Sequence, residues 1–279
     1  MPTSTVDLPR GRGPHPAIVG LHPADDASRD HYLFRHLAKV LPRRGIAVAR
    51  FDRRGDDVPF EDQIADTLDV LTELRRRPEI DAARIGLWGF SQGAWIAPMV
   101  ASRTDVAFLV LVASVGVTPA AQMLYGTAKH VREAGFGDGA ADRVIAARRR
   151  VDEYRRGRGS VSDAQRAIDA IKDEPFFAHA YLPADAGALG PWPDMDFDPA
   201  PVFAQVKVPV LLFYGEDDEW QPIDASIRAW RDSGNSDLTI VRLPGAAHAP
   251  TIGGVKDIAK VSPDYERALV SWLLRVTAG

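Results

Sequence analysis

The sequence predicts an α/β protein with a mostly parallel, doubly wound β-sheet and a helical insertion. Short apolar runs alternate with amphipathic segments over residues 1–117, and the same alternation returns over residues 202–279. Residues 118–201 are rich in Ala, Arg and Asp and contain no run typical of a strand. Strands that are apolar throughout are buried on both faces, and helices between them form the crossovers of a parallel sheet. We therefore expect one core domain made of the two outer segments, with residues 118–201 inserted as a helical lid.

Four strands and three helices are expected in the first core segment. The strands are short apolar runs, and the helices carry apolar residues at helical spacing on one face. Gly45 and Pro78 follow the first two helices, as is typical of helix ends. The expected strands cover residues 17–21, 46–51, 84–90 and 106–113, and the expected helices cover residues 32–44, 60–77 and 92–102.

The second core segment predicts two more strands, at residues 208–214 and 238–243, and helices at residues 223–233 and 263–276. In the insertion, Gly and Pro clusters separate several helical stretches. We expect this helical insertion to cover one end of the sheet.

The composition excludes several classes of function. The 279-residue chain has a net charge of −4, which gives no basic surface for nucleic acid or anionic lipid. No apolar run approaches the roughly 20 residues that span a bilayer. The chain has no cysteine, which excludes disulfides, thiolate nucleophiles and cysteine-based metal sites. Residues 1–16 lack the apolar stretch of a secretory signal, and we expect a soluble cytoplasmic protein.

The segment G-F-S-Q-G at residues 89–93 predicts a nucleophilic serine, Ser91. The segment follows an expected strand and precedes an expected helix, which is the setting of a nucleophile elbow. The turn must be sharp for the serine oxygen to stand clear of the sheet, so side chains at Gly89 and Gly93 would collide with neighbouring backbone. The N–H of Gln92, at the start of the helix, can donate to a developing oxyanion. The alternative is that Ser91 merely caps the helix.

A serine hydroxyl needs a base, and an acid must hold that base in place. In hydrolases with this elbow, the chain order is serine, acid, histidine. Of the three histidines after Ser91, His130 and His179 lie in the insertion, where we expect surface or packing roles. His248 lies in a loop marked by Gly and Pro, between an expected strand and the last helix. We expect His248 to be the base.

The acid is expected in the loop that follows the strand at residues 208–214. That loop reads G-E-D-D-E-W-Q-P and offers four carboxylates, so position must decide between them. In a strand followed by G-x-x-D-x-x-x-P, the fourth residue turns toward the base, and here it is Asp218. Asp217 is the alternative. Either carboxylate would fix the tautomer of His248 and stabilise its protonated form.

Together these motifs resemble those of the α/β-hydrolase superfamily, in particular bacterial hydrolases related to dienelactone hydrolases and acylaminoacyl-peptidase-like esterases. The resemblance covers nearly the whole chain except the insertion. It implies the α/β-hydrolase fold and a triad of Ser91, Asp218 and His248, but it does not specify the substrate. It is carried by R-F-D-R-R-G at residues 50–55, F-E-D-Q-I-A-D at 60–66, G-F-S-Q-G at 89–93, V-P-V-L-L-F-Y-G-E-D-D at 208–218 and G-A-A-H at 245–248.

The sequence departs from this family where the second half of the oxyanion hole is expected. Relatives usually carry H-G-x-G at this point, whereas this chain reads H-P-A-D-D at residues 22–26. Pro23 has no N–H, but the donor position corresponds to Ala24, which keeps one. We therefore expect the backbone N–H groups of Ala24 and Gln92 to form the hole.

Asp25 and Asp26 add negative charge beside this site. A carboxylate there opposes an oxyanion unless it points away or pairs with a cation, for which Arg29 and Arg53 are the candidates. Loss of one oxyanion donor costs roughly 3–4 kcal/mol, so the geometry of this loop matters for catalysis.

A second departure concerns the edge of the sheet. Relatives often have extra antiparallel strands before residue 17, and here only residues 3–8 could supply one. The trimmed edge leaves room for a homodimer, although no motif supports one.

The leading expectation is a serine hydrolase that cleaves carboxylic esters of small to medium substrates through an acyl-enzyme. Amide, peptide or thioester hydrolysis by the same triad remains open. The altered loop at residues 22–26 also leaves open a non-hydrolytic descendant, such as a lyase, a cyclase or a ligand-binding protein. We expect no cofactor, no metal and a small-molecule substrate. The side chains proposed to contact it are Asp25, Tyr125, Trp192 and Trp220, although aromatic residues of the insertion could equally pack the lid onto the core.

Overall fold

The computed structural model describes residues 2–55 and 58–278. The chain forms two compact units, one built around a sheet and one helical. The sheet unit contains the chain up to Gly116, Pro199–Asp218, and the chain from Ile223 onward. The helical unit contains Val117–Asp198 and the short segment Glu219–Pro222.

The described part of the sheet unit contains one seven-stranded sheet in the order β1-β3-β2-β4-β5-β6-β7. Strand β1 pairs antiparallel with β3, and all other neighbouring strands are parallel. This confirms the mostly parallel, doubly wound sheet that the sequence predicts. The strands are β1 (Ser4–Asp7), β2 (His15–Leu21), β3 (Ala47–Phe51), β4 (Ile80–Phe90), β5 (Leu109–Val112), β6 (Val210–Gly215) and β7 (Leu238–Leu243).

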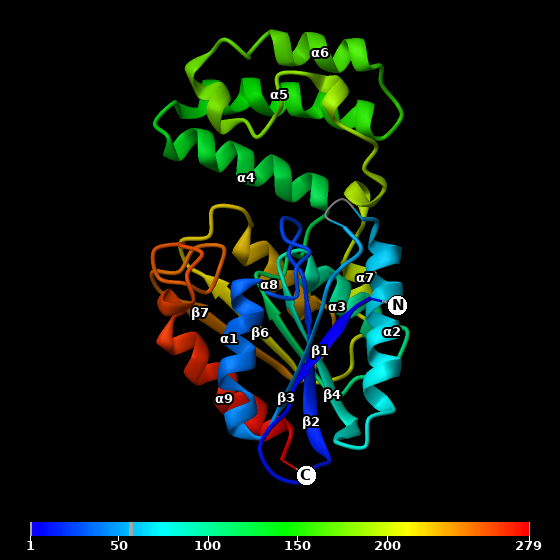
Figure 1. Ribbon diagram of the computed structural model, residues 1–279. Helices are drawn as coiled ribbons and strands as arrows, with labels where there is room; N and C mark the ends of the chain where they lie inside the picture. Colours follow the sequence, from blue (N-terminus) through cyan, green and yellow to red (C-terminus); the bar gives the residue numbers. More distant parts are fainter. Residues whose placement is uncertain (1, 56–57, 279) are drawn as a thin grey trace. The chain divides into compact units, whose positions relative to one another are not determined.

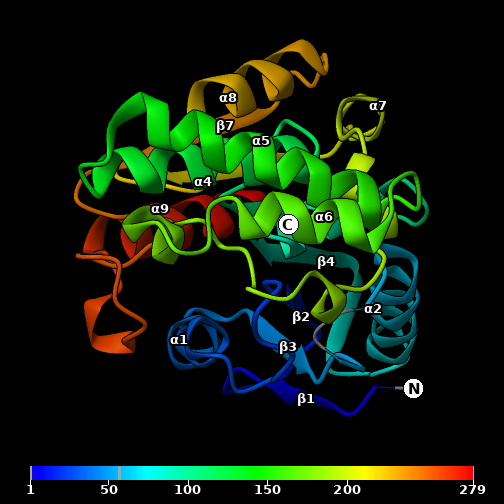
Figure 2. The same ribbon diagram turned by 90° about the horizontal axis from the view of Figure 1, so that it is seen from above.

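Helices cover both faces of this sheet (Figures 1 and 2). Helices α1 (Tyr32–Val40) and α9 (Pro263–Val276) lie on one face, and α2 (Phe60–Arg75) and α3 (Gly93–Ala101) lie on the other. The short helix α7 (Ala200–Phe203) and α8 (Ile223–Asp232) complete the regular α-helices of the unit, which also has 3-10 turns at Pro42–Arg44 and Ile258–Lys260.

Large aromatic side chains fill the core between the sheet and helices α1 and α9. The fully buried rings of Phe34 and Trp88 meet edge to face, with centroids 5.7 Å apart. The indole N–H of Trp88 donates to the hydroxyl of Tyr265 at 2.9 Å, which satisfies two buried polar groups at once. This packing anchors β4, the strand that leads directly into the candidate nucleophile.

The helical unit has its own small core. Its three longer helices are α4 (Pro119–Glu133), α5 (Gly137–Arg155) and α6 (Val161–Asp169). Shorter 3-10 turns follow at Pro175–His179, Ala186–Ala188 and Pro193–Asp196. Residues 118–201 contain no strand, as the sequence predicts.

Two element ends lie four residues from their predicted positions, and several others lie one to three residues away. The helix expected at residues 32–44 ends at Val40, because Pro42 has no N–H and its ring would clash with the preceding turn, so a 3-10 turn follows. Strand β4 begins four residues early, at Ile80, where it pairs with His15. Residues 4–7 do form the additional antiparallel strand at the sheet edge.

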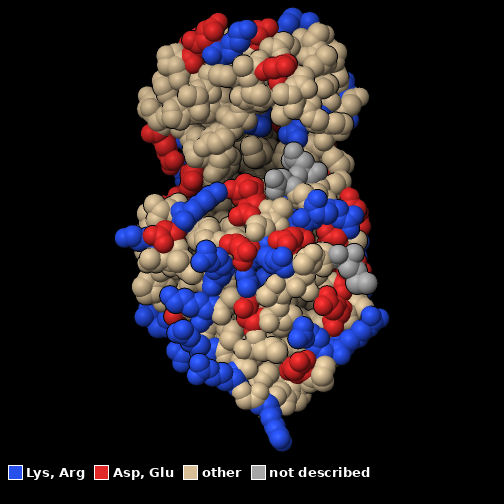
Figure 3. Space-filling model, in the orientation of Figure 1, with Lys and Arg blue, Asp and Glu red and all other residues tan. Residues whose placement is uncertain are grey.

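No described helix could span a membrane, and the face shown in Figure 3 carries charges of both signs. None of the helices within residues 2–55 and 58–278 is long and apolar enough to cross a bilayer. On the face that Figure 3 shows, basic and acidic side chains occur together around the sheet unit. This mixture agrees with the small net charge of the chain.

Candidate active site

Ser91 lies on a strained turn between β4 and α3. Its φ angle is +54°, a left-handed conformation that costs a non-glycine residue free energy. A side chain at Gly89 would overlap the carbonyl group of Gly93, and one at Gly93 would overlap the carbonyl group of Leu21. The predicted collisions at both glycines are therefore confirmed, and the turn has the geometry of a nucleophile elbow.

Three side chains from distant parts of the sheet unit form a chain of hydrogen bonds. Nε2 of His248 lies 2.9 Å from Oγ of Ser91, and its Nδ1 lies 2.9 Å from Oδ2 of Asp218. The ring of Phe90 supports the imidazole, with centroids 5.3 Å apart. The structure thus brings together the three residues that the sequence proposes as nucleophile, acid and base.

The burial of the two candidate acids separates them. Asp218 is completely buried, whereas Asp217 is exposed. An ionised carboxylate can only accept hydrogen bonds, so contact with Asp218 places the proton of a neutral His248 on Nδ1. Nε2 is then the acceptor for the hydroxyl of Ser91, which is the arrangement that general-base activation requires.

Close backbone approach holds the acid and base loops together. Strands β6 and β7 are parallel neighbours, so the loops that follow them leave the same edge of the sheet. The N–H of Asp217 donates to the carbonyl of Ala246 at 3.0 Å. A side chain at Gly215 would overlap the carbonyl oxygens of both Ala246 and Ala247. Gly215 is therefore needed for the two loops to meet.

Two backbone N–H groups beside Ser91 are available to an anion. Among the residues that the structure describes, none accepts a hydrogen bond from the N–H of Ala24 or from that of Gln92. Gln92 is the N-cap of α3, where N–H groups carry the positive end of the helix dipole. These are the two donors that the sequence proposes for the oxyanion hole.

Of the two carboxylates that follow Ala24, Asp25 is paired with a cation other than the predicted ones, and Asp26 accepts a backbone hydrogen bond. Asp25 forms an ion pair with Lys256 at 2.6 Å rather than with Arg29 or Arg53. Partial burial alone would raise the pKa of Asp25, but the hydrogen bond and charge of Lys256 lower it. Oδ1 of Asp26 accepts the N–H of Ser28 at 2.8 Å. The prediction of an arginine partner is wrong because Lys256, from the loop after His248, reaches the exposed side of Asp25.

His22, at the start of the altered loop, is a core residue. It is 2% exposed and lies between the rings of Phe34 and Phe51, with both centroids 4.9 Å away. Burial and then the positive charge of Arg53 lower the pKa of His22 to about 3. It is therefore neutral at pH 7, although its neighbours in the chain border the candidate site.

The aromatic residues proposed to contact substrate lie in the helical unit. Trp220 packs against His130 and Tyr181, with ring centroids 4.6 and 4.5 Å away. Tyr125 is 39% exposed on α4. Their role in substrate binding stays a prediction.

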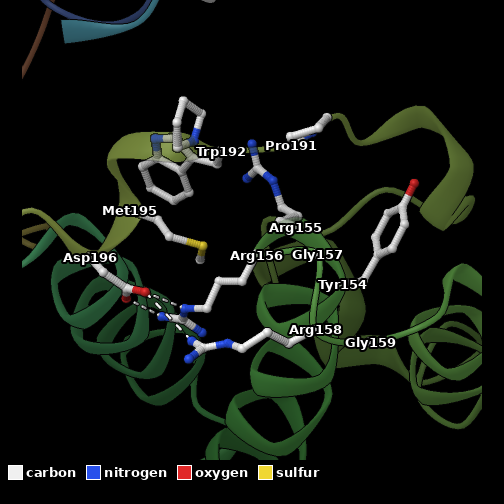
Figure 4. Close-up of a pocket in the computed structure, with 11 residues that line it drawn as sticks. Tyr154, Arg155, Arg156, Gly157, Arg158, Gly159, Pro191, Trp192, Met195 and Asp196 are labelled. Carbon is white, nitrogen blue, oxygen red and sulfur yellow. Dashed lines mark hydrogen bonds and ion pairs between the residues drawn. The ribbon is translucent and has the colours of Figure 1, made fainter.

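Trp192 lines a different feature of this unit, a surface pocket of about 590 Å³ (Figure 4). The guanidinium of Arg155 lies 4.8 Å from the centre of the Trp192 ring. Arg156 and Arg158 both reach Asp196, at 2.6 and 3.6 Å. Glu153 also contacts both arginines, at 3.1 and 3.5 Å, so two carboxylates compensate the two positive charges.

No metal site is evident in the part of the chain that the structure describes. Residues 2–55 and 58–278 contain no group of three or more His, Asp or Glu side chains arranged to hold a metal ion.

The chain belongs to the α/β-hydrolase family, whose model matches residues 18–260. Esterase EstD of Thermotoga maritima is 22% identical over an aligned stretch of 228 residues, and the match covers 75% of this chain and 48% of EstD. The chain thus spans about half the length of that relative. The narrower resemblance to dienelactone hydrolases and acylaminoacyl peptidases stays a prediction.

Solved structures share the whole fold at low sequence identity. The 2,6-dihydroxy-pseudo-oxynicotine hydrolase has a TM-score of 0.61 and 16% identity, over 99% of this chain and 64% of that one. Est1E from Butyrivibrio proteoclasticus has a TM-score of 0.59 and 15% identity, over 99% and 94% of the two chains. These similarities establish the α/β-hydrolase fold.

Proposed function

We propose that the protein is a serine hydrolase that cleaves carboxylic esters of small to medium substrates. The observation that carries the proposal is the continuous hydrogen-bonded chain from Ser91 through His248 to Asp218. The elbow at Ser91 supports it, as do the N–H groups of Ala24 and Gln92, for which the described residues provide no acceptor. The esterase relative favours an ester over other acyl substrates.

Acylation would begin when His248 removes the hydroxyl proton of Ser91 and the oxygen attacks the ester carbonyl carbon. The N–H groups of Ala24 and Gln92 would donate to the resulting oxyanion. His248, stabilised as a cation by Asp218, would then protonate the departing alcohol. An acyl group remains bonded to Oγ of Ser91.

Deacylation would use the same residues, with water in place of the serine hydroxyl. His248 would deprotonate a water molecule that attacks the acyl carbon, and would then return that proton to Oγ of Ser91 as the second tetrahedral intermediate releases the free acid. The fixed Nδ1–H tautomer of His248 serves both steps.

A substitution at Ser91 tests this proposal. Ser91→Ala is expected to lower kcat for a short-chain nitrophenyl ester by several orders of magnitude, because the nucleophile is lost. Ser102→Ala is a matched control, because Ser102 follows the other end of α3 and its hydroxyl donates only locally, to Met99. Anilide and thioester analogues of the same acyl group, assayed in parallel, rank the possible leaving groups.

The proposal would be refuted if Ser91→Ala hydrolysed the ester as fast as the unsubstituted protein. A higher kcat/KM for the anilide than for the ester would instead make the protein an amidase with the same nucleophile.

A further inference from the structure

One buried cation, Arg53, contacts both sides of the proposed oxyanion hole. Arg53 follows β3 and is 5% exposed. Its Nη1 donates to the carbonyl of Pro23 at 3.0 Å, and its Nη2 donates to the carbonyl of Ala24 at 3.0 Å. Its Nη1 also donates to Oε1 of Gln92 at 2.9 Å. The guanidinium thus connects the altered loop to the residue that follows the nucleophile.

The contact with Pro23 fixes the direction of a proposed donor. The Pro23 carbonyl and the Ala24 N–H belong to one peptide group, which is trans. A planar trans peptide holds its C=O and N–H in opposite directions. Because the Pro23 carbonyl points at Arg53, the N–H of Ala24 must point away from Arg53. No described residue accepts this N–H. Its orientation is therefore set by the hydrogen bond from Arg53 to the carbonyl of the same peptide group.

Arg53 also holds the residue of the other proposed donor, here through its side chain, while the carbonyl of the Ser91–Gln92 peptide accepts the N–H of Ala94 at 2.9 Å. Oε1 of Gln92 accepts hydrogen bonds from Arg53 and from Nε2 of Gln63, the latter at 3.1 Å. Nε2 of Gln63 is itself held by the carbonyl of Val58 at 2.7 Å. The side chain of Gln92 is therefore anchored away from the candidate site, while its backbone N–H stays available.

The chemistry of the arginine suits this role better than that of a lysine. Two nitrogens of one planar guanidinium reach two consecutive carbonyl groups, which a single ammonium cannot do in the same geometry. The Arg53 side chain also donates through Nε to the carbonyl of Gly55 at 2.6 Å, and this contact fixes the plane of the guanidinium group.

We propose that Arg53 is the positioning residue of the oxyanion hole: it orients the N–H of Ala24 toward the oxyanion through the Pro23 carbonyl and keeps the side chain of Gln92 away from the site. The inference rests on the proposed function, because it concerns stabilisation of an intermediate on Ser91. It explains how the H-P-A-D-D loop supplies a donor without the glycines that relatives carry.

The test compares Arg53→Lys, which keeps the charge, with Arg53→Met, which removes every donor. Both variants are expected to lower kcat for a nitrophenyl ester by on the order of a hundredfold, with KM little changed. A trifluoromethyl ketone adds to a serine hydroxyl and forms an oxyanion, so its affinity should fall by the same factor as kcat/KM. Millimolar guanidinium should restore part of the kcat of Arg53→Ala.

Arg50→Met is the matched control. Arg50 lies on β3, three residues before Arg53, its side chain is 11% exposed, and it binds the carboxylate of Asp7 at 2.8 Å and the carbonyl of Arg29 at 3.0 Å. Its loss should lower the thermal unfolding temperature without changing kcat or ketone affinity. Thermal unfolding of every variant identifies any that fails to fold, and Arg53→Lys together with the guanidinium rescue then decides the outcome.

Folded Arg53 variants that keep kcat and ketone affinity would overturn the inference. An equal loss of both in Arg50→Met would also overturn it, because the effect would then be one of general stability. An unsubstituted protein without Ser91-dependent ester hydrolysis would overturn the proposed function itself, and this inference with it.

Discussion

Asp217 and Asp218 are adjacent in the chain, but the fold gives their side chains different environments. Asp217 is exposed to water, which weakens its interaction with any charge. Asp218 is fully buried and lies 2.9 Å from Nδ1 of His248. A charge pair with little water around it interacts more strongly than an exposed one. Asp218 is therefore the carboxylate able to stabilise a protonated His248.

This difference leads to a prediction at the scale of one residue. Asp218→Asn is expected to lower kcat/KM for a nitrophenyl ester by roughly 10⁴-fold, because an amide at this position favours the wrong tautomer of the histidine. Asp217→Asn removes the same charge one residue away and should leave kcat/KM nearly unchanged. Steady-state assays of both variants make the comparison, and similar losses in both would contradict this assignment.

Local sequence could predict the candidate catalytic residues but not the contacts that position them. Ser91 and His248 stand in motifs whose meaning depends on neighbouring residues. The ion pair of Asp25 joins it to Lys256, which is 231 residues away, and no local pattern encodes such a contact. The hydrogen bonds from Arg53 to residues 23, 24 and 92 are also long-range contacts that no local pattern encodes, because they depend on how the three preceding strands are aligned.

At the scale of elements, the order of strands and helices in the sheet unit was predictable because each element has a clear periodicity. Strand β7 and helix α9 have the predicted ends, since turn residues and a proline bound them. Element ends moved where a long-range pairing or a single backbone group decides them. The pairing of Ile80 with His15 extends β4, and Pro42 ends α1 early.

The end of β6 provides a prediction about how elements place the base. Gly215→Ala should displace the backbone at Ala246 and Ala247, because its Cβ would overlap both carbonyl oxygens. Overpacking of this kind costs about 1–3 kcal/mol of stability. The shift should also move His248 and lower kcat. Urea unfolding and ester hydrolysis measure the two effects.

Gly139→Ala is the control for this substitution. Gly139 lies in the first turns of α5, and an added Cβ there meets open space. Alanine should stabilise that helix by roughly 0.5–1 kcal/mol, without loss of activity. If Gly215→Ala were as stable and as active as Gly139→Ala, the close approach of the two loops would not be needed.

At the scale of the whole molecule, the alternation of strands and helices predicted the sheet. The internal packing of the helical unit could not be predicted from the sequence. Its helices contain few large apolar residues, so several arrangements satisfy the same pattern. The segment Glu219–Pro222 follows the candidate acid in the chain yet belongs to the helical unit, where Trp220 contacts His130. That this unit acts as a lid and sets specificity stays a prediction.

The stability of the folded protein should depend on pH through His22. Its pKa falls from an ordinary 6.5 to about 3 in the folded state, because burial and then Arg53 oppose its charge. The unfolded chain therefore binds the proton first. This contribution to the free energy of unfolding is fully present above about pH 6.5 and declines as the pH falls toward about 3.

His22→Gln removes this titration. At pH 4.5 the unsubstituted protein should have lost about 2–3 kcal/mol through His22 alone, relative to pH 7.5. Urea unfolding at both pH values measures the loss of unfolding free energy on acidification. This loss should be about 2–3 kcal/mol smaller in His22→Gln than in the unsubstituted protein. The pKa values of His31 and His36 are also lowered by burial, but they contribute to both proteins and cancel in the comparison. Equal acid sensitivity of the two proteins would show that His22 is not held neutral.

The central claim is that Ser91 is a nucleophile activated by His248 and Asp218. The most direct measurement treats the protein with a fluorophosphonate and locates the added mass by peptide mass spectrometry. We predict one phosphonyl group on the Oγ of Ser91, absent from Ser91→Ala and formed much more slowly in His248→Ala. An unmodified Ser91 in protein that still hydrolyses the ester, or a label on a different residue, would contradict the claim.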